Sequence, residues 1–177
     1  MAQILAVKLG GSIITSKKEG EPEIKREVIL RLAQEIKAAR TKKFFDLILV
    51  HGVGSFGHGL AKKYKLWEGL KNKSQIIPFA QTQAQTITLN HHVLEIFHSV
   101  GLPVMGVNPT TIILQKDKNL LTFETRVIKH LLDNHFIPVL YGTIVQDKNL
   151  TFSICSGDTI LMYLAKKFNA QKAIFCQ

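Results

Sequence analysis

Two short runs of apolar residues each end directly in a cluster of glycines. The first, "ILAVKL" (residues 4–9), leads into Gly10 and Gly11, and the second, "FFDLILV" (residues 44–50), leads into "HGVGSFGHG" (residues 51–59). A short apolar run that is bounded by turn residues is typical of a strand buried on both faces. Such strands belong to parallel sheets with helices on both sides, so we expect an α/β fold.

Segments with helical spacing of apolar residues alternate with these strands and with further ones along the chain. Helices are expected at residues 22–40, 59–67, 78–101, 124–136 and 156–170, and additional strands at residues 103–107, 137–145 and 172–176. Polar turns between apolar runs predict β-hairpins over residues 110–123 and around residues 146–152. The sequence therefore predicts a mostly parallel sheet sandwiched by helices, with β-hairpin excursions.

Composition limits the classes of partner. The chain has 177 residues, 46% apolar and 20% charged, which suffices for one globular unit with its own core. No stretch reaches the roughly 18 uninterrupted apolar residues of a membrane span, so we expect no membrane partner. Cys155 and Cys176 lack metal-binding spacing, so we expect no protein metal site and a reducing, cytoplasmic location.

The net charge of +10 would suit nucleic acid, an anionic surface or small phosphorylated ligands. The lysines lie mostly in pairs at the ends of expected helices, with no aromatic residues interleaved among them. A solvated surface is therefore favoured over nucleic-acid binding, which rests on charge alone.

Both glycine loops have the character of phosphate sites. Unpaired backbone N–H groups in a glycine turn attract anions, and glycine lets the backbone approach closely. Neither loop is a P-loop, and the match of "GVGSFG" to GxGxxG lacks the acidic residue expected after the next strand. Lys8 would place an ammonium at the same edge as Gly10 and Gly11. It could neutralise a phosphoryl group during transfer, or it could simply extend toward water from the strand end.

The segment "SGDTILMYLA" (residues 156–165) predicts the start of a capped helix. Ser156 is a typical N-cap residue, and the helix dipole favours a carboxylate such as Asp158 in the first turn. The same carboxylate could instead hold Lys8 and Lys17 in position beside a phosphate. The residues alone leave both interpretations open.

Four segments in this order resemble the amino acid kinase superfamily: "KLGGS", "LVHGVGSFGH", "IPVLYGTIV" and "SGDTILMYLA". Within it the chain is most similar to the isopentenyl phosphate kinases, and the resemblance runs from Ile4 onward. The discriminating residue is His58, because superfamily members that act on carboxylates lack a histidine there. The resemblance implies that His58 hydrogen-bonds the phosphate of the acceptor; a histidine at the start of a helix could also simply face solvent.

The resemblance further implies a phosphotransferase that uses ATP and Mg²⁺ to convert isopentenyl phosphate into isopentenyl diphosphate. The residues implied to bind ATP are Lys8, Gly10, Gly11, Lys17 and Gly157. Those implied to hold the acceptor are Gly52, Val53, Ser55, His58, Gly142 and Thr143. The implied catalytic set, in which Asp158 orients the lysines, is Lys8, Lys17, His58 and Asp158. Phe79 and Ile87 are candidates to line an apolar slot for the isoprenoid tail, and a homodimer is implied as well.

Three departures from the family pattern bear on these expectations. Val53 stands where glycine is usual, and a β-branched residue tolerates positive φ badly. Thr143 stands where aspartate is common. The resemblance also implies that residues 1–177 form the acceptor-binding N-terminal lobe, with the nucleotide-binding C-terminal lobe largely absent, so the isolated chain would have little or no activity. Alternatives are a kinase of the same fold for another acceptor (a phosphonate such as fosfomycin, or a nucleoside monophosphate) or a non-catalytic lobe that binds a phosphorylated metabolite.

Overall fold

A five-stranded parallel sheet forms the centre of the fold. The computed structural model describes residues 3–18 and 20–177. The order of the strands in the sheet is β11-β1-β4-β8-β5, with parallel pairing at each step. Their bounds are Ile4–Leu9 (β1), Asp46–His51 (β4), Val104–Gly106 (β5), Ile137–Tyr141 (β8) and Lys172–Cys176 (β11). This arrangement confirms the α/β fold with a mostly parallel sheet expected from the apolar runs.

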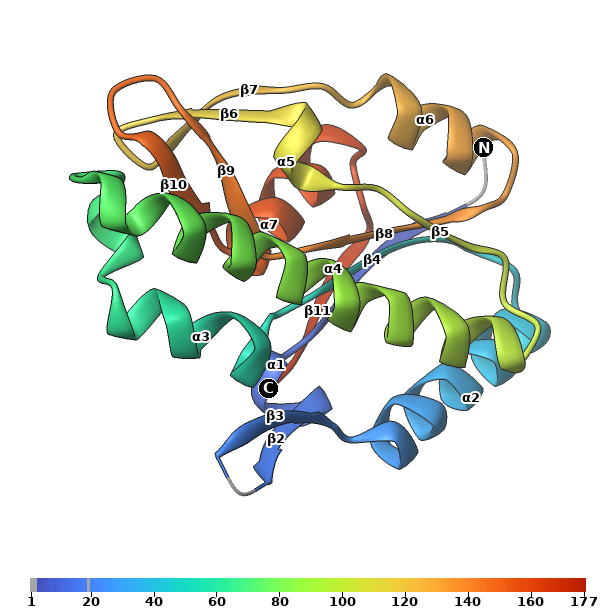
Figure 1. Ribbon diagram of the computed structural model, residues 1–177. Coiled ribbons are helices and arrows are strands. Elements are labelled where there is room, and N and C mark those ends of the chain that lie inside the picture. The colour runs from blue at the N-terminus through green and yellow to red at the C-terminus, as the bar shows by residue number, and fades with distance from the viewer. Residues whose placement is uncertain (1–2, 19) are drawn as a thin grey trace.

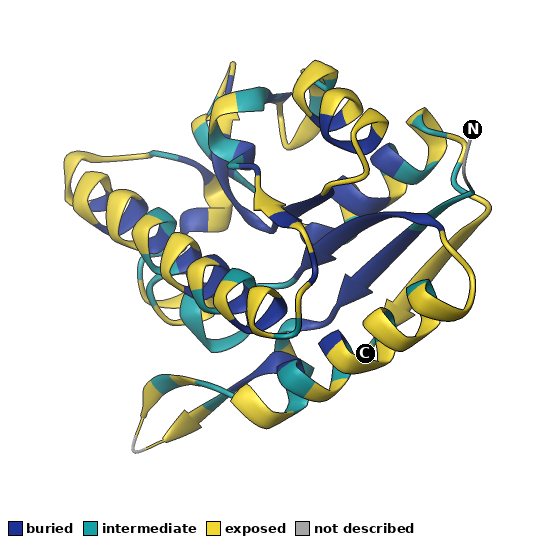
Figure 2. Cartoon of the chain, turned by 90° about the vertical axis from the view of Figure 1, so that its right-hand side faces the viewer, coloured by how far each residue is buried: buried dark blue, intermediate teal, exposed yellow. Residues whose placement is uncertain are grey.

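Helices cover both faces of this sheet (Figure 1). The helices α2 (Arg26–Lys42) and α4 (Ile76–Ser99) lie on one face, and α6 (Arg126–Asp133) and α7 (Gly157–Lys167) lie on the other. Alternate residues of β4 serve the two cores: Leu47 and Leu49 pack in the first, and Ile48 and Val50 in the second. Figure 2 shows the central strands of the sheet as a buried layer between helices whose outer faces are exposed, whereas the edge strand β11 is exposed.

The chain passes from the first sheet into a second sheet at Gly142, between the end of one strand and the start of the next. The single strand expected over residues 137–145 is wrong, because β8 ends at Tyr141 and Thr143 begins β9 (Thr143–Asp147). A Cβ on Gly142 would lie 3.0 Å from the Gly157 nitrogen, so the chain passes close to the start of α7 as it changes sheets. The second sheet has the order β10-β9-β6-β7, with β6 at Ile113–Lys116, β7 at Asn119–Phe123 and β10 at Thr151–Cys155. It contains both expected hairpins.

The segment after the first glycine loop also differs from expectation. It forms a short helix, α1 (Gly11–Ile14), and then a hairpin of β2 (Thr15–Lys18) and β3 (Glu21–Ile24). The expected helix over residues 22–40 therefore begins later, at Arg26, because residues 22–24 pair with β2 instead. The helix α3 (Gly54–Lys63) begins earlier than expected, inside the second glycine loop.

The remaining elements are short. They are α5 (Pro109–Ile112) and the 3₁₀ turns η1 (Leu66–Glu68) and η2 (Lys73–Gln75). Among residues 3–18 and 20–177, none of the helices combines the length and apolar character needed to cross a bilayer.

Asp147 links the two hairpins of the second sheet. Its buried carboxylate accepts hydrogen bonds of 2.8 to 3.1 Å from the Ser153 hydroxyl and from the backbone N–H groups of Asp117, Lys118, Asn149 and Leu150. Asp117 and Lys118 have positive φ angles of 50° and 67°; aspartate tolerates this left-handed conformation, whereas it is unfavourable for lysine. Burial acts to raise the pKa of Asp147, but the donated hydrogen bonds outweigh it and lower the pKa to about 2.

Replacing Asp147 with asparagine should lower the free energy of unfolding by about 2 to 4 kcal/mol, because the new NH₂ group would face N–H donors. Urea denaturation at pH 7 measures this. Asp133→Asn, which removes an exposed carboxylate paired with Lys129, is the control and should change the free energy by less than about 1 kcal/mol.

The stabilisation by Asp147 should also depend on pH. The folded pKa of about 2 lies below the reference value of 3.8, so the contribution is present above about pH 4 and is lost as the pH falls toward 2. The stability difference between the parent chain and Asp147→Asn should therefore shrink over that range. Two results would contradict this role: a stability difference that stays constant down to pH 2, or an equal loss of unfolding free energy in Asp147→Asn and Asp133→Asn at pH 7.

Candidate functional site

A pocket of about 780 Å³ lies at the carboxyl ends of β1, β4 and β8. In open α/β sheets this edge is where ligands bind, because loops and helix starts converge there. The pocket wall combines both glycine loops, the segment around Gly142 and the start of α7. Its walls therefore come from segments far apart in the sequence.

The two glycine loops touch backbone to backbone. A Cβ on Gly11 would lie 2.2 Å from the Gly54 nitrogen, and a Cβ on Gly52 would lie 2.6 Å from the Gly11 nitrogen. Thr15 joins the loops further, since its buried hydroxyl donates to the Gly11 carbonyl at 2.7 Å and accepts from the Ser55 N–H at 3.0 Å. Only glycine at these positions permits such an approach.

Lys8 and Asp158 form an ion pair at the polar end of the pocket. The Lys8 Nζ lies 2.9 Å from Asp158 Oδ1, with 8% of the lysine side chain and 50% of the aspartate side chain exposed. Lys8 lies two residues after Ala6 along β1, so its side chain leaves the same face of the sheet, the one that α7 covers. Ser156 caps α7 as expected, because its hydroxyl accepts from the Thr159 N–H at 3.1 Å. Asp158 therefore both occupies the first turn of α7 and forms an ion pair with Lys8.

The glycine loop accommodates Val53 without strain. Val53 has φ −94° and ψ −17°, and the positive φ expected to be a problem falls on Gly54 instead, at 46°. A Cβ on Gly57 would lie 2.5 Å from Val53 Cγ2, so this glycine makes room for the valine. One residue later, His58 is exposed and lines the pocket.

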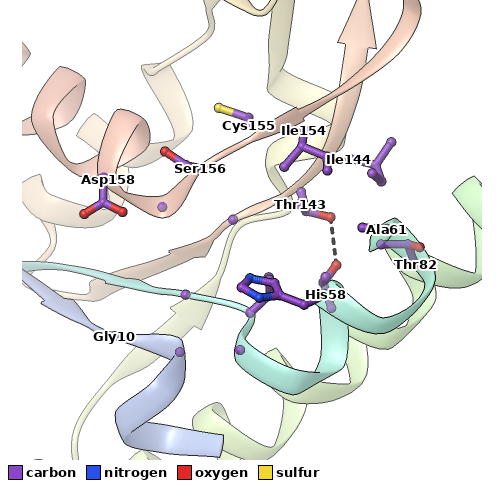
Figure 3. A pocket seen from close by; sticks show the side chains of 18 of the residues that line it. Gly10, His58, Ala61, Thr82, Thr143, Ile144, Ile154, Cys155, Ser156 and Asp158 are labelled. Atoms are coloured by element: carbon purple, nitrogen blue, oxygen red, sulfur yellow. Dashed lines mark hydrogen bonds between the residues drawn. The ribbon is translucent and has the colours of Figure 1, made fainter. Parts of the chain in front are cut away.

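The opposite end of the pocket is apolar. Ile144 on β9 and Ile154 on β10 are cross-strand partners, and Ala61 on α3 lies beside them. Figure 3 shows these side chains gathered at one end, whereas Gly10, His58 and Asp158 lie toward the other. Between the two ends, the hydroxyls of Thr86 and Thr143 share a hydrogen bond of 2.7 Å. The pocket thus has one anion-attracting end and one apolar end.

The structure brings most of the predicted site residues to this pocket. Those that line it are Lys8, Gly10, Gly11, Gly52, Val53, His58, Gly142, Thr143, Gly157 and Asp158. The Gly10 N–H, however, donates to the Cys176 carbonyl at 2.7 Å. That donor is therefore paired beside the sheet in this structure, and the role of Gly10 at a phosphate stays a prediction.

Lys17 and Ser55 are not among the residues that line the pocket. Lys17 is exposed on β2, outside the pocket wall. Ser55 donates its hydroxyl to the Ser16 carbonyl at 2.6 Å and its N–H to Thr15, so both of its donors are already paired. In this structure Ser55 joins α3 to the β2–β3 hairpin, and its place on the acceptor phosphate stays a prediction.

The two tail candidates are also placed elsewhere. Phe79 is buried behind Ala61 and Ile144 in a small core cluster, and Ile87 is 40% exposed on the outside of α4. The residues that do form the apolar end, Ile144 and Ile154, lie at matching distances from the turn of the predicted second hairpin. Their equal distance from the turn could have predicted that they face each other across the hairpin.

Further pocket residues were missed in the sequence. They include Ser12, Thr82, Thr86 and Cys155. Thr82 and Thr86 have the i, i+4 spacing that puts polar side chains on one helix face, a signal available within the expected helix. Cys155 is buried, and burial raises the pKa of its thiol to about 12, so it contributes a neutral wall rather than a nucleophile.

Replacing Gly11 with alanine should force the two glycine loops apart. We expect the free energy of unfolding to fall by about 1 to 3 kcal/mol, as for other overpacked sites, and phosphate binding to weaken as well. Gly59→Ala is the matched control, since no atom lies within 4 Å of the added Cβ and alanine favours the helix. Thermal unfolding of both variants measures the effect; a Gly11→Ala protein as stable as Gly59→Ala would refute the close contact.

Comparison with known proteins identifies the family. Residues 3–177 match the sequence profile described as the amino acid kinase family. The isopentenyl phosphate kinase of Methanothermobacter thermautotrophicus is 32% identical to this chain, over 97% of this chain and 65% of that protein. The isopentenyl phosphate kinase of Methanocaldococcus jannaschii is 36% identical, over 96% of this chain and 66% of that protein.

A solved structure of isopentenyl phosphate kinase superposes with a TM-score of 0.91 at 31% identity, over 98% of this chain and 72% of that one. The chain thus spans slightly less than two thirds of the length of the two curated relatives. It agrees with the family in fold over nearly its whole described length. This chain belongs to the amino acid kinase family.

Proposed function

We propose that this chain binds isopentenyl phosphate and forms part of an ATP-dependent kinase that converts it into isopentenyl diphosphate. The observation that carries the proposal is the two-ended pocket. Glycine backbone, Lys8 and His58 stand at one end, and Ile144, Ile154 and Ala61 at the other. A phosphate monoester with a short branched hydrocarbon tail matches both ends. The relatives named isopentenyl phosphate kinase support the same acceptor.

The acceptor phosphate would lie at the polar end. His58 would donate an imidazole N–H to it, and the backbone of Gly52 and Val53 would lie against it. A phosphate oxygen is already anionic near neutral pH, so it can attack a phosphoryl group without a strong general base. The chemistry then depends on positioning and on charge stabilisation rather than on a protein nucleophile.

The donor set at the polar end fits the phosphates of ATP. Lys8 supplies a largely buried cation that Asp158 holds in place, and Gly11 and Gly157 expose backbone beside it. ATP bound there with Mg²⁺ would supply the phosphoryl group that is transferred. Lys8 would offset the charge of that group. Lys17, on the β2–β3 hairpin, stays a predicted contact of the ATP phosphates.

Within the described residues, no three His, Cys, Asp or Glu side chains lie together as a metal site. Asp158 is the only acidic side chain among the described residues that line the pocket. We therefore expect Mg²⁺ to be held mainly by phosphate oxygens, with Asp158 near it.

The apolar end favours an isoprenoid tail over the other acceptors. A nucleoside monophosphate or a small phosphonate would leave Ile144 and Ile154 without an apolar partner, whereas an isopentenyl group would cover them. Thr82, Thr86 and Thr143 keep their hydroxyls in hydrogen bonds within the protein, so they present methyl groups without leaving unpaired polar atoms.

In this proposal residues 3–177 act as the acceptor-binding lobe. The parts of the relatives that this chain does not span would bind the rest of the nucleotide. A homodimer and a cytoplasmic location also stay predictions. Sedimentation velocity would test the first, and the two free thiols, Cys155 and Cys176, accord with the second.

Calorimetric titration tests the acceptor assignment. Isopentenyl phosphate should bind more tightly than inorganic phosphate, isopentenol, fosfomycin or a nucleoside monophosphate, because it alone engages both ends. His58→Ala should weaken binding of isopentenyl phosphate by about 10- to 100-fold, the loss expected for a hydrogen bond to a charged group. A nucleoside monophosphate binding more tightly than isopentenyl phosphate, or unchanged binding to His58→Ala, would contradict the assignment.

The apolar end has its own test. Ile154→Ala should weaken binding of isopentenyl phosphate by about 3- to 10-fold, since it removes apolar surface from the tail, and should leave inorganic phosphate binding unchanged. Ile87→Ala is the matched control, because Ile87 lies outside the pocket on the same protein. Equal effects of the two substitutions would place the tail elsewhere.

A further inference from the structure

His51 is a buried polar side chain that the proposed chemistry does not use. It is the last residue of β4, is fully buried, and stands immediately before the glycine loop. Its Nδ1 lies 3.0 Å from the Gly52 carbonyl oxygen, and its Nε2 lies 3.2 Å from Asn90 Oδ1 on α4. The ring stacks on Tyr141 at a centroid distance of 5.4 Å. The imidazole is therefore held from three sides.

These contacts determine which nitrogen carries the proton. Burial lowers the pKa of His51, so at pH 7 the ring is neutral and has one N–H group. With a single N–H group, only one of the two ring nitrogens can donate a hydrogen bond, and the other must accept one. The Gly52 carbonyl has no alternative donor to offer, whereas the side-chain amide of Asn90 can turn and present its NH₂ group. The consistent arrangement is that Nδ1–H donates to Gly52 and that Asn90 donates to Nε2.

The bond from Nδ1 sets the direction of the next peptide group. In a trans peptide the carbonyl of one residue and the N–H of the next point in opposite directions, and the described residues contain no cis peptide. When the Gly52 carbonyl points inward to His51, the Val53 N–H must point away from it. Val53 lines the pocket, and among the described residues its N–H donates to no protein acceptor.

We propose that His51 is a positioning residue that holds the Gly52–Val53 peptide with its N–H facing the pocket, where it donates to the acceptor phosphate. The inference rests on the proposed phosphate site. A glycine peptide can rotate easily, so without this clamp the carbonyl oxygen of Gly52 could face the pocket instead and repel an anion.

His51 also joins the other walls of the pocket. Its own carbonyl accepts the Gly142 N–H at 3.1 Å, and a Cβ on Gly157 would lie 3.0 Å from that oxygen. The glycine loop, the end of β8 and the start of α7 thus meet at one residue. A change in the backbone at His51 would reach all three of them.

The tautomer of His51 gives a test that needs no ligand. Nitrogen-15 NMR of the imidazole in the ligand-free chain at pH 7 should show a proton on Nδ1 and a lone pair on Nε2. A proton on Nε2 alone, or on both nitrogens, would overturn the proposal. Because this measurement concerns the free protein, its result is independent of whether isopentenyl phosphate is the acceptor.

Two substitutions separate positioning from simple packing. An asparagine at position 51 places its NH₂ near the position of Nδ1 and can still donate to Gly52, whereas a glutamine places its amide near Nε2 and cannot. His51→Asn should bind isopentenyl phosphate within about threefold of the parent chain. His51→Gln should bind at least tenfold more weakly, even where the two variants unfold at similar urea concentrations. Equal affinity of the two variants would overturn the proposal.

The amide signal of Val53 completes the design. On addition of isopentenyl phosphate it should shift strongly in the parent chain and in His51→Asn but not in His51→Gln. If the parent chain binds no isopentenyl phosphate, the proposed function fails while the tautomer still decides the role of His51. If either variant does not fold, the tautomer again decides.

Discussion

The contact between the two glycine loops is the constraint on which the rest of the site depends. The backbone of Gly11 meets that of Gly52 and Gly54 at a distance that excludes any side chain. This contact brings the ends of β1 and β4 together, so that Lys8 and the start of α3 face one cavity. The hydroxyl of Thr15 then joins the two loops, and the imidazole of His51 holds the second loop at Gly52.

The pocket combines two environments, a polar one and an apolar one. At one end, the ion pair of Lys8 and Asp158 sits among backbone donors in a partly buried setting, where charge interactions are stronger than in water. At the other end, the β9–β10 hairpin contributes Ile144 and Ile154. Asp147 stabilises that hairpin, so the apolar wall depends on a carboxylate that does not itself line the pocket.

Much of the fold could be predicted from local patterns, because the apolar runs and the Ser156 cap depend on neighbouring residues. The break between strands at Gly142 could not, since it follows from a contact with the distant start of α7. The pairing of β2 with β3 is local, but residues 15–18 and 21–24 lack the apolar alternation that would have predicted two strands. In the site, Lys8, His58 and Asp158 stood out through residue type and position. The pairing of Ser55 with Thr15 and Ser16, and the bond from His51 to Gly52, depend on geometry that no spacing encodes.

The central claim is that one ligand occupies both ends of the pocket, with its phosphate on the glycine loops. The most direct measurement is a ¹H–¹⁵N NMR titration of the chain with isopentenyl phosphate. We predict that the amides of Gly11, Gly54 and His58 and those of Ile144 and Ile154 shift together, along a single binding curve. Shifts confined to one end, two separate curves, or shifts centred outside the pocket would contradict the account.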